Sequence, residues 1–215
     1  MGMRHVTERG MLVLADISGF TAFVTATELE HGPPIIAALL EEVIGELSPP
    51  LEIHQVEGDA VFALGPDGVV TPPALLWRIL QGAVGAFKAR QREMARDQSC
   101  SCHVCRSVSN LSLKIVAHHG RFLRHAIGGR EQVAGTDVIL AHRLLKNHLV
   151  ETPCYLLLTE AALRWVGMDS SCTGLVAHTE HYDHLGDVRC FVKDLGAAGG
   201  ELDHALGLPA RQVVA

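Results

Sequence analysis

The sequence predicts an α+β fold in which helices pack on a largely antiparallel sheet. Apolar segments of strand length alternate along the chain with segments whose apolar residues recur at helical spacing. Several strand-like segments are joined by short turns that contain glycine, which is typical of antiparallel hairpins. The 215 residues are 48% hydrophobic, which is enough for one substantial core. Together these three observations predict a single domain.

Five elements are expected in the first half of the chain. They are a strand at 11–15, a helix at 20–30, a helix at 35–47, a hairpin at 51–56 and 60–64, and a long helix at 75–95. The break between the first two helices coincides with Gly32-Pro33-Pro34, and prolines are accepted in the first turn of the helix that follows. Glu57-Gly58 supplies the hairpin turn.

The second half of the chain continues the same pattern. We expect a strand at 111–118, its hairpin partner at 121–127, a helix at 136–148, a strand at 155–158, a short helix at 160–166 and terminal strands near 174–181 and 187–192. Gly120 is assigned to the turn of the first hairpin. Residues 1–195 are expected to form one domain with a Cys-rich loop at about 98–110, and residues 196–215 a loosely held tail.

Composition excludes several classes of partner. The net charge of −6 and the lack of a long Lys/Arg run argue against binding of nucleic acid or an anionic membrane surface. No segment is long and apolar enough to span a membrane, and the N-terminus does not read as a signal peptide. A cytoplasmic location is therefore expected, where the six cysteines are thiols or metal ligands rather than disulfides.

Two carboxylates stand in matched surroundings, each where an apolar, strand-like run meets a Gly-containing turn. Asp16 follows the first expected strand, and Asp59 follows the hairpin turn. Carboxylates so placed can hold divalent metal ions. Backbone N–H groups near Gly19, Phe20 and Thr21 open an expected helix and can face an anion. The pair favours a metal–phosphate site, although each aspartate taken singly also suits an ordinary turn or cap.

A third motif, Gly135-Thr136-Asp137-Val138-Ile139-Leu140-Ala141-His142-Arg143, follows in order along the chain. With Asp16-Ile17-Ser18-Gly19-Phe20-Thr21 and the Gly58-Asp59 hairpin, it resembles the class III adenylate/guanylate cyclase catalytic domain. That family carries Asp-Ile-x-Gly-Phe-Thr, a hairpin with Gly-Asp, and Gly-x-x-Val-Asn-x-Ala-x-Arg on a helix. The resemblance extends from about residue 11 to about residue 195. It implies the ferredoxin-like, cyclase-type sandwich of that family.

The resemblance implies two-metal chemistry on a purine nucleoside triphosphate. Mg²⁺ or Mn²⁺ held by Asp16, Ile17 and Asp59 would activate a ribose 3′-hydroxyl and neutralise the phosphates while cyclic nucleotide and pyrophosphate form. Arg143 matches the family's arginine that stabilises charge on the reacting phosphate, although a solvent-facing helix arginine is the plain alternative. In the family the site lies between two protomers, so a homodimer is also implied.

Three positions depart from the family pattern. Ile139 stands where cyclases carry an asparagine that orients the ribose and stabilises the transition state, and isoleucine can do neither. Gln55 and Gln132 replace the base-selecting residues, and a glutamine pair can hydrogen-bond a purine without selecting one. Residues 182–188 lack the Lys-Gly pattern that brings a triphosphate-binding lysine. Loss of one transition-state group slows a reaction about 10²–10³-fold, so binding can outlast turnover.

A cysteine cluster lies outside the cyclase pattern. Cys100, Cys102, Cys105 and the intervening His103 fall within six residues, a density that suits tetrahedral Zn²⁺ with a fourth ligand from His103 or elsewhere. No second Cys pair follows at zinc-finger spacing, so a reduced or redox-sensitive loop is the alternative. The other three cysteines fall in or beside expected strands, as buried inert thiols: Cys154, Cys172 and Cys190.

Two classes of function remain open. One is a dimeric nucleotide cyclase that depends on Mg²⁺ or Mn²⁺. The other is a cyclase-fold regulatory module that binds a nucleotide or another ligand without turnover and has a Cys-bound structural metal. Ile139 favours the module, whereas Asp16 and Asp59 favour retained metal–phosphate binding. Lys146 and Asn147, one turn beyond the arginine, are candidates to compensate at the phosphates.

Overall fold

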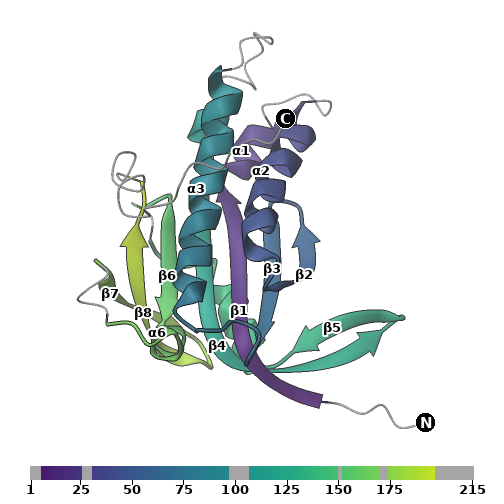
Figure 1. Ribbon diagram of the computed structural model, residues 1–215, viewed down its shortest axis with the longest axis vertical. Helices are drawn as coiled ribbons and strands as arrows, with labels where there is room; N and C mark the ends of the chain where they lie inside the picture. Colours follow the sequence, from purple (N-terminus) through teal and green to yellow (C-terminus); the bar gives the residue numbers. More distant parts are fainter. Residues whose placement is uncertain (1–5, 26–30, 97–106, 150–151, 170–173, 197–215) are drawn as a thin grey trace.

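One eight-stranded sheet with packed helices makes up the computed structural model, which describes residues 6–25, 31–96, 107–149, 152–169 and 174–196 (Figure 1). The strands are β1 (Val6–Ser18), β2 (Glu52–Glu57), β3 (Ala60–Pro66), β4 (Ser112–Ile127), β5 (Arg130–Ala134), β6 (Tyr155–Thr159), β7 (Val176–Tyr182) and β8 (Gly186–Asp194). The helices are α1 (Phe20–Thr25), α2 (Gly32–Leu47), α3 (Leu75–Arg96), α5 (Thr136–Leu144) and α6 (Glu160–Val166), with a 3₁₀ turn η1 (Val108–Asn110).

The sheet is mixed but mostly antiparallel. Its order is β2-β3-β1-β4-β6-β8-β7, and β5 pairs with β4 outside this path. The β4–β6 pair is parallel, and the remaining pairs are antiparallel. The α+β class expected from the sequence is confirmed. None of the described helices is long and apolar enough to cross a membrane.

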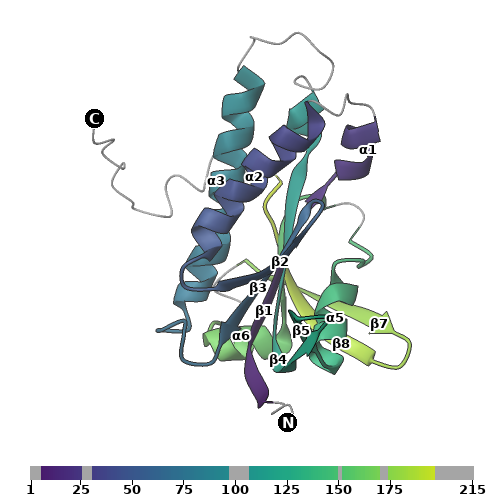
Figure 2. The same ribbon diagram turned by 90° about the vertical axis from the view of Figure 1, so that its right-hand side faces the viewer.

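Strand β1 shows how both faces of the sheet are filled. Successive side chains in a strand point to opposite faces. Met11 and Val13 pack in the core that α2, α3 and α6 cover, whereas Leu12 and Leu14 pack in the core that α5 covers. Figure 2 shows α2 and α3 on one side of the sheet and α5 on the other. Each fully buried leucine of these cores contributes about 1.5–3 kcal/mol.

The two prolines at the start of the second helix are accepted in its first turn, as expected, and the helix begins at Gly32 rather than at residue 35. Pro33 and Pro34 occupy the first turn of α2, where their missing N–H groups leave no helical hydrogen bond unmade. The preceding helix, expected at 20–30, is α1 at Phe20–Thr25, and residues 26–30 lie outside the described part of the chain.

Gly120 is not in a turn, which corrects the hairpin expected between 111–118 and 121–127. β4 continues through this position, and the turn lies at Gly128-Gly129, where φ is +59° and +78°. Glycine is needed at position 120 because α5 lies against the strand: a Cβ there would meet the Asp137 side chain at about 2.5 Å. A glycine inside a strand often marks such a close approach.

Helix α5 ends at Leu144 rather than at residue 148. The Leu144 carbonyl accepts a hydrogen bond from Asn147 Nδ2 (2.8 Å). The His148 N–H, which would bind that carbonyl in a longer helix, donates instead to Glu180 Oε1 (2.9 Å). The expected end was wrong because tertiary partners take over the hydrogen bonds of the last turn.

Candidate functional site

Strand alternation places Asp16 and Lys114 on the face of the sheet that α5 covers. Asp16 follows Leu12 and Leu14 at two-residue steps along β1, and Lys114 precedes Val116 in the same way on β4. Asp16 and Lys114 are direct neighbours in the β1–β4 ladder. They form one wall of a cleft of about 910 Å³ whose other wall is α5.

Asp59 lies beside Asp16 at the turn between β2 and β3. Its carbonyl accepts a hydrogen bond from the Ile17 N–H (3.1 Å), and Ala60 pairs with Asp16 in the β1–β3 ladder. Burial and the nearby negative charge of Asp16 raise the pKa of Asp59. The structure therefore brings the two predicted carboxylates close enough for their charges to interact. A cation shared by both would reduce the repulsion between them.

Lys114 is the cleft residue that the sequence motifs did not reveal. Its Nζ lies 2.8 Å from Asp16 Oδ2, with the two side chains 21% and 19% exposed. Lys114 becomes a site residue through the pairing of β1 with β4, because this pairing places Lys114 opposite Asp16. Strand pairing is a tertiary property that no local pattern in the sequence states.

Helix α5 and the turn after it form the other wall of the cleft. Ile139, His142 and Arg143 line it from the helix, and Lys146 and His148 from the following turn. A helix turns by about 100° per residue, yet the cleft is wide enough for the consecutive His142 and Arg143 to line it together.

The described lining of the cleft carries more positive than negative charge. Lys114, Arg143 and Lys146 face it, and Asp16 is the one carboxylate among the described lining residues. Such a surface attracts anions. Asn147 does not contribute, because its Nδ2 donates to Leu144 and to the Tyr155 hydroxyl (2.6 Å).

A smaller cavity of about 210 Å³ shares lining residues with the cleft. His142 and Leu145 line both, and Gln55 and Phe62 line the smaller one. The ring centroids of His142 and Phe62 are 5.1 Å apart, edge to face. Burial lowers the pKa of His142, so this ring is neutral at pH 7. Glu57 also lines the cavity and accepts a hydrogen bond from Gln55 Nε2 (3.3 Å), and the rest of the lining is aliphatic. Two rings beside polar groups suit a flat heterocycle.

Gln132 is not brought to this cavity. It lies on β5 opposite His125, and it is not among the described lining residues of either cavity. The β4–β5 hairpin projects from the body of the sheet in Figure 1.

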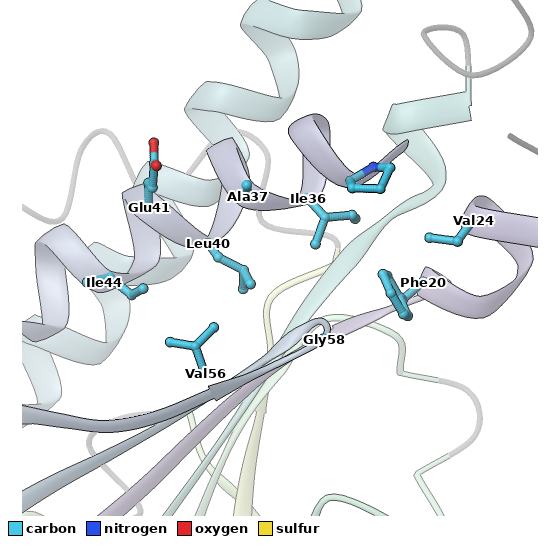
Figure 3. Close-up of a pocket in the computed structure, with 10 residues that line it drawn as sticks. Phe20, Val24, Ile36, Ala37, Leu40, Glu41, Ile44, Val56 and Gly58 are labelled. Atoms are coloured by element: carbon cyan, nitrogen blue, oxygen red, sulfur yellow. The ribbon is translucent and has the colours of Figure 1, made fainter. Parts of the chain in front are cut away.

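The segment from Gly19 to Thr21 begins α1, a helix of six residues. Gly19 has φ +88°, a conformation that glycine adopts without strain. The Phe20 side chain points into a separate apolar cavity of about 370 Å³ between α1, α2 and the β2–β3 turn (Figure 3). Ile36, Leu40 and Val56 also line this cavity, so it does not suit a phosphate. Phe20 therefore offers an anion only its backbone N–H, whereas the Thr21 side chain is exposed.

The oxygen donors at the β1 and β3 ends fit a hard divalent cation. Asp16 and Asp59 offer carboxylates, and Ile17 can offer only its backbone carbonyl. Oxygen ligands of this kind suit Mg²⁺ and Mn²⁺. The ammonium of Lys114 already contacts one of these oxygens, Asp16 Oδ2.

The candidate zinc ligands Cys100, Cys102 and Cys105 lie outside the described residues, as does Cys172. Cys154 and Cys190 are buried free thiols, as expected. Burial raises the pKa of both, to about 12 for Cys190, which leaves these thiols protonated and inert at neutral pH.

A second polar cluster, on β2 and β5, is occupied by an arginine. Glu52, His54 and Glu131 lie close enough to share an ion. Arg124 already binds both oxygens of Glu52 (2.9 Å each), Glu131 (2.6 Å) and Glu8 (2.9 Å). Its guanidinium neutralises these carboxylates, so the cluster is structural.

Solved structures with the same fold are nucleotide cyclases. The adenylyl cyclase CyaB from P. aeruginosa matches 90% of this chain and 100% of its own at 17% identity, with a TM-score of 0.60. A bacterial light-regulated adenylyl cyclase matches 89% of this chain and 54% of its own at 13% identity, with a TM-score of 0.67. The guanylyl cyclase Cya2 matches 89% and 93% at 17% identity, with a TM-score of 0.59. The chain therefore has the fold of class III nucleotide cyclase catalytic domains.

Within this fold class the chain belongs to the family described as "Protein of unknown function (DUF2652)", whose model matches residues 36–155. It is also similar to "Uncharacterized protein Rv2561/Rv2562" of Mycobacterium tuberculosis, with 31% identity over 170 residues, 76% of this chain and 74% of the relative. The family is thus a divergent branch of the cyclase fold.

Proposed function

We propose that the protein binds a purine nucleoside triphosphate with Mg²⁺ or Mn²⁺ in the cleft between β1, β4 and α5. The observation that carries this proposal is the arrangement of charge. Asp16, Lys114, Arg143 and Lys146 line one cleft, and Asp59 lies close enough to Asp16 for their charges to interact. A cyclase domain described as a complex with GTP shares the fold at 13% identity and a TM-score of 0.60.

Each part of the cleft has a role in this proposal. The cation, held by Asp16, Asp59 and the Ile17 carbonyl, would neutralise phosphate charge and lower the pKa of a hydroxyl. Arg143 presents a planar guanidinium that can bind two phosphate oxygens at once, and Lys146 adds a point charge. The base would lie against Phe62 and His142 in the adjoining cavity, with the Gln55 amide at its edge.

Ile139 favours binding with little turnover. It is 54% exposed and lines the cleft at the position where the cyclase pattern has asparagine. Its side chain has no hydrogen-bond donor for the ribose or for developing negative charge. We therefore favour a nucleotide-binding regulatory module whose cyclase activity is weak or lost.

A second copy of the chain completes the proposed site. A related guanylyl cyclase domain is described as a non-canonical dimer and shares the fold at 12% identity with a TM-score of 0.57. Sedimentation equilibrium should give twice the mass of one chain, and a monomer at all concentrations would contradict this part of the proposal.

Calorimetric titration with ATP and with GTP, each in the presence of Mn²⁺, tests the proposal. Wild-type protein should bind at least one of them, and an Asp16→Asn, Asp59→Asn double variant should not. Glu93→Gln, an exposed carboxylate on α3, is the matched control and should bind as wild type does. Assay of the mixtures for cyclic nucleotide then separates an enzyme from a binding module. No binding of either nucleotide would refute the proposal.

Lys146→Ala should weaken nucleotide binding. Its ammonium faces the cleft one turn beyond Arg143, and a solvent-exposed charge near a phosphate is worth about 1 kcal/mol or less. The same titration should therefore show a loss of up to about fivefold in affinity. Unchanged affinity would remove Lys146 from the site.

A further inference from the structure

In the free protein, we propose, Lys114 occupies the cation position at Asp16, so that phosphate groups must engage the lysine before a divalent ion can bind there. This inference rests on the proposed function and adds a control of metal entry by a positioning residue. Its basis is one contact, the 2.8 Å pair between Lys114 Nζ and Asp16 Oδ2.

The sheet holds this pair in place. Asp16 and Lys114 are opposite each other in the β1–β4 ladder, where they follow and precede the buried Ala15 and Ile115. Cross-strand neighbours on one face have their Cβ atoms about 4.5–5.5 Å apart. The lysine therefore reaches the carboxylate without depending on a mobile loop.

The pair is also shielded. About four-fifths of each side chain is covered, at 21% and 19% exposure, so water and salt screen its attraction less than that of a surface pair. A divalent ion that approaches Asp16 meets a carboxylate whose Oδ2 already accepts from an ammonium. It also meets the repulsion of that ammonium, so metal binding requires Lys114 to leave.

An anion is the partner that can draw Lys114 away. Among the described lining residues of the cleft, Asp16 is the one carboxylate, and the other charged side chains there are those of Arg143 and Lys146. Asp59 is a second carboxylate near enough to feel the charge of Lys114, but a divalent ion at this site would engage it together with Asp16. A triphosphate in the cleft would instead supply oxygens that remain free for the lysine. Nucleotide and metal should then bind with positive coupling, and the coupling must act in both directions.

Replacement of the lysine should remove the barrier to metal. Lys114→Met keeps the length of the side chain and removes its charge, so it should bind Mn²⁺ alone about tenfold more tightly than wild type, as expected when a buried carboxylate loses its partner. Lys114→Arg should stay as weak as wild type. Lys146→Met removes one charge from the same cleft without touching Asp16 and should change the affinity roughly twofold or less.

Electron paramagnetic resonance of free Mn²⁺, with no nucleotide present, measures these affinities directly. Tighter binding in Lys114→Met that is abolished by an added Asp16→Asn supports the inference. Equal Mn²⁺ affinity in folded wild type and Lys114→Met overturns it. If Lys114→Met does not fold, Lys114→Gln replaces it, with the same expected gain in affinity.

A second titration separates this inference from the proposed function. Inorganic triphosphate with EDTA present should bind wild type and bind Lys114→Met more weakly. A Mn²⁺ gain in Lys114→Met together with failure of ATP and GTP to bind would leave the lysine–metal competition standing and refute the nucleotide site. Nucleotide binding without tighter Mn²⁺ binding in Lys114→Met would support the nucleotide site and refute the competition between Lys114 and the metal.

Discussion

Ile139 is the residue that, in the proposed site, favours binding over reaction. It lies on α5 one turn before Arg143, half exposed, so a polar replacement costs little packing. The Asp16 carboxylate and the Arg143 guanidinium have the chemistry that nucleotide binding needs, whereas Ile139, like Gln55, departs from the cyclase pattern. A single missing hydrogen-bond donor is worth two to three orders of magnitude in rate at such a position.

Ile139→Asn should therefore raise cyclic nucleotide formation by about 10²–10³-fold over wild type. The amide restores a donor and an acceptor at the cleft wall. Mass-spectrometric assay of cyclic AMP and cyclic GMP with Mn²⁺ measures the gain, and Ile139→Ala controls for loss of the side chain. Equal rates in all three proteins would show that turnover is limited by something else in the cleft.

Gly120 shows how one residue without a side chain fixes the position of α5. Gly120→Ala would force its Cβ against the Asp137 side chain at about 2.5 Å. Overpacking of this kind should lower the free energy of unfolding by about 1–3 kcal/mol. Urea denaturation of the variant and of wild type measures this difference. Gly85→Ala, in α3 with no heavy atom within 4 Å, is the control and should be neutral or stabilising by up to about 1 kcal/mol.

At the scale of elements, a buried carboxylate holds the end of α5 and thereby one wall of the cleft. Glu180 on β7 is 1% exposed and accepts hydrogen bonds from His148 N (2.9 Å), His148 Nδ1 (2.7 Å) and His178 Nε2 (2.6 Å). Burial opposes its ionisation, but the hydrogen bonds from His178 and His148 outweigh burial and lower the pKa of Glu180. The contribution of Glu180 to the free energy of unfolding is present above pH 4.5, the pKa of an ordinary glutamate, and is lost as the pH falls through the lowered pKa.

Glu180→Gln should lower the free energy of unfolding by about 1–3 kcal/mol, because a neutral amide cannot accept all three hydrogen bonds. It should also weaken nucleotide binding, since the turn that carries Lys146 and His148 loses its anchor. Urea denaturation and calorimetry measure the two effects. Asp187→Asn, an exposed carboxylate on β8 that pairs with His181, should change neither. Unaltered stability in Glu180→Gln would mean that this cluster does not hold the helix end.

At the scale of the whole molecule, His118 joins three elements in the core. Its Nδ1 lies 2.9 Å from Thr159 Oγ1 and its Nε2 lies 3.2 Å from Asp137 Oδ1, so β4, β6 and α5 meet at one ring. Burial lowers the pKa of His118, which favours the neutral imidazole. The Asp137 carboxylate can only accept, so in the neutral ring Nε2 carries the proton and Nδ1 accepts from the Thr159 hydroxyl.

Stability should therefore decrease as the pH falls below about 6.5. In that window the unfolded chain binds a proton at His118 that the folded chain excludes, and each unit of pKa difference is worth about 1.4 kcal/mol. Urea denaturation at pH 7.5 and pH 5.5 measures the loss, which His118→Gln should reduce. His142, whose pKa burial also lowers, should account for part of the remainder. Identical pH dependence in the variant would contradict this assignment.

The sequence by itself determined the fold class, most element positions and the outline of the candidate site. Strand and helix periodicity are local properties, and Asp16, Asp59 and Arg143 stand in motifs that can be read one segment at a time. The break before α2 at its glycine and prolines was equally local and was predicted, although α2 begins at Gly32 rather than at residue 35.

Tertiary structure decided what depends on pairing between distant segments. The β1–β4 register put Lys114 on Asp16, the approach of Asp137 made Gly120 a contact point rather than a turn, and Glu180 ended α5 before residue 148. Gln132, on β5, lies outside the described lining of the cavity that Gln55 lines. In each case the determining partner lies far away in the chain, and local patterns carry no information about which distant groups will meet.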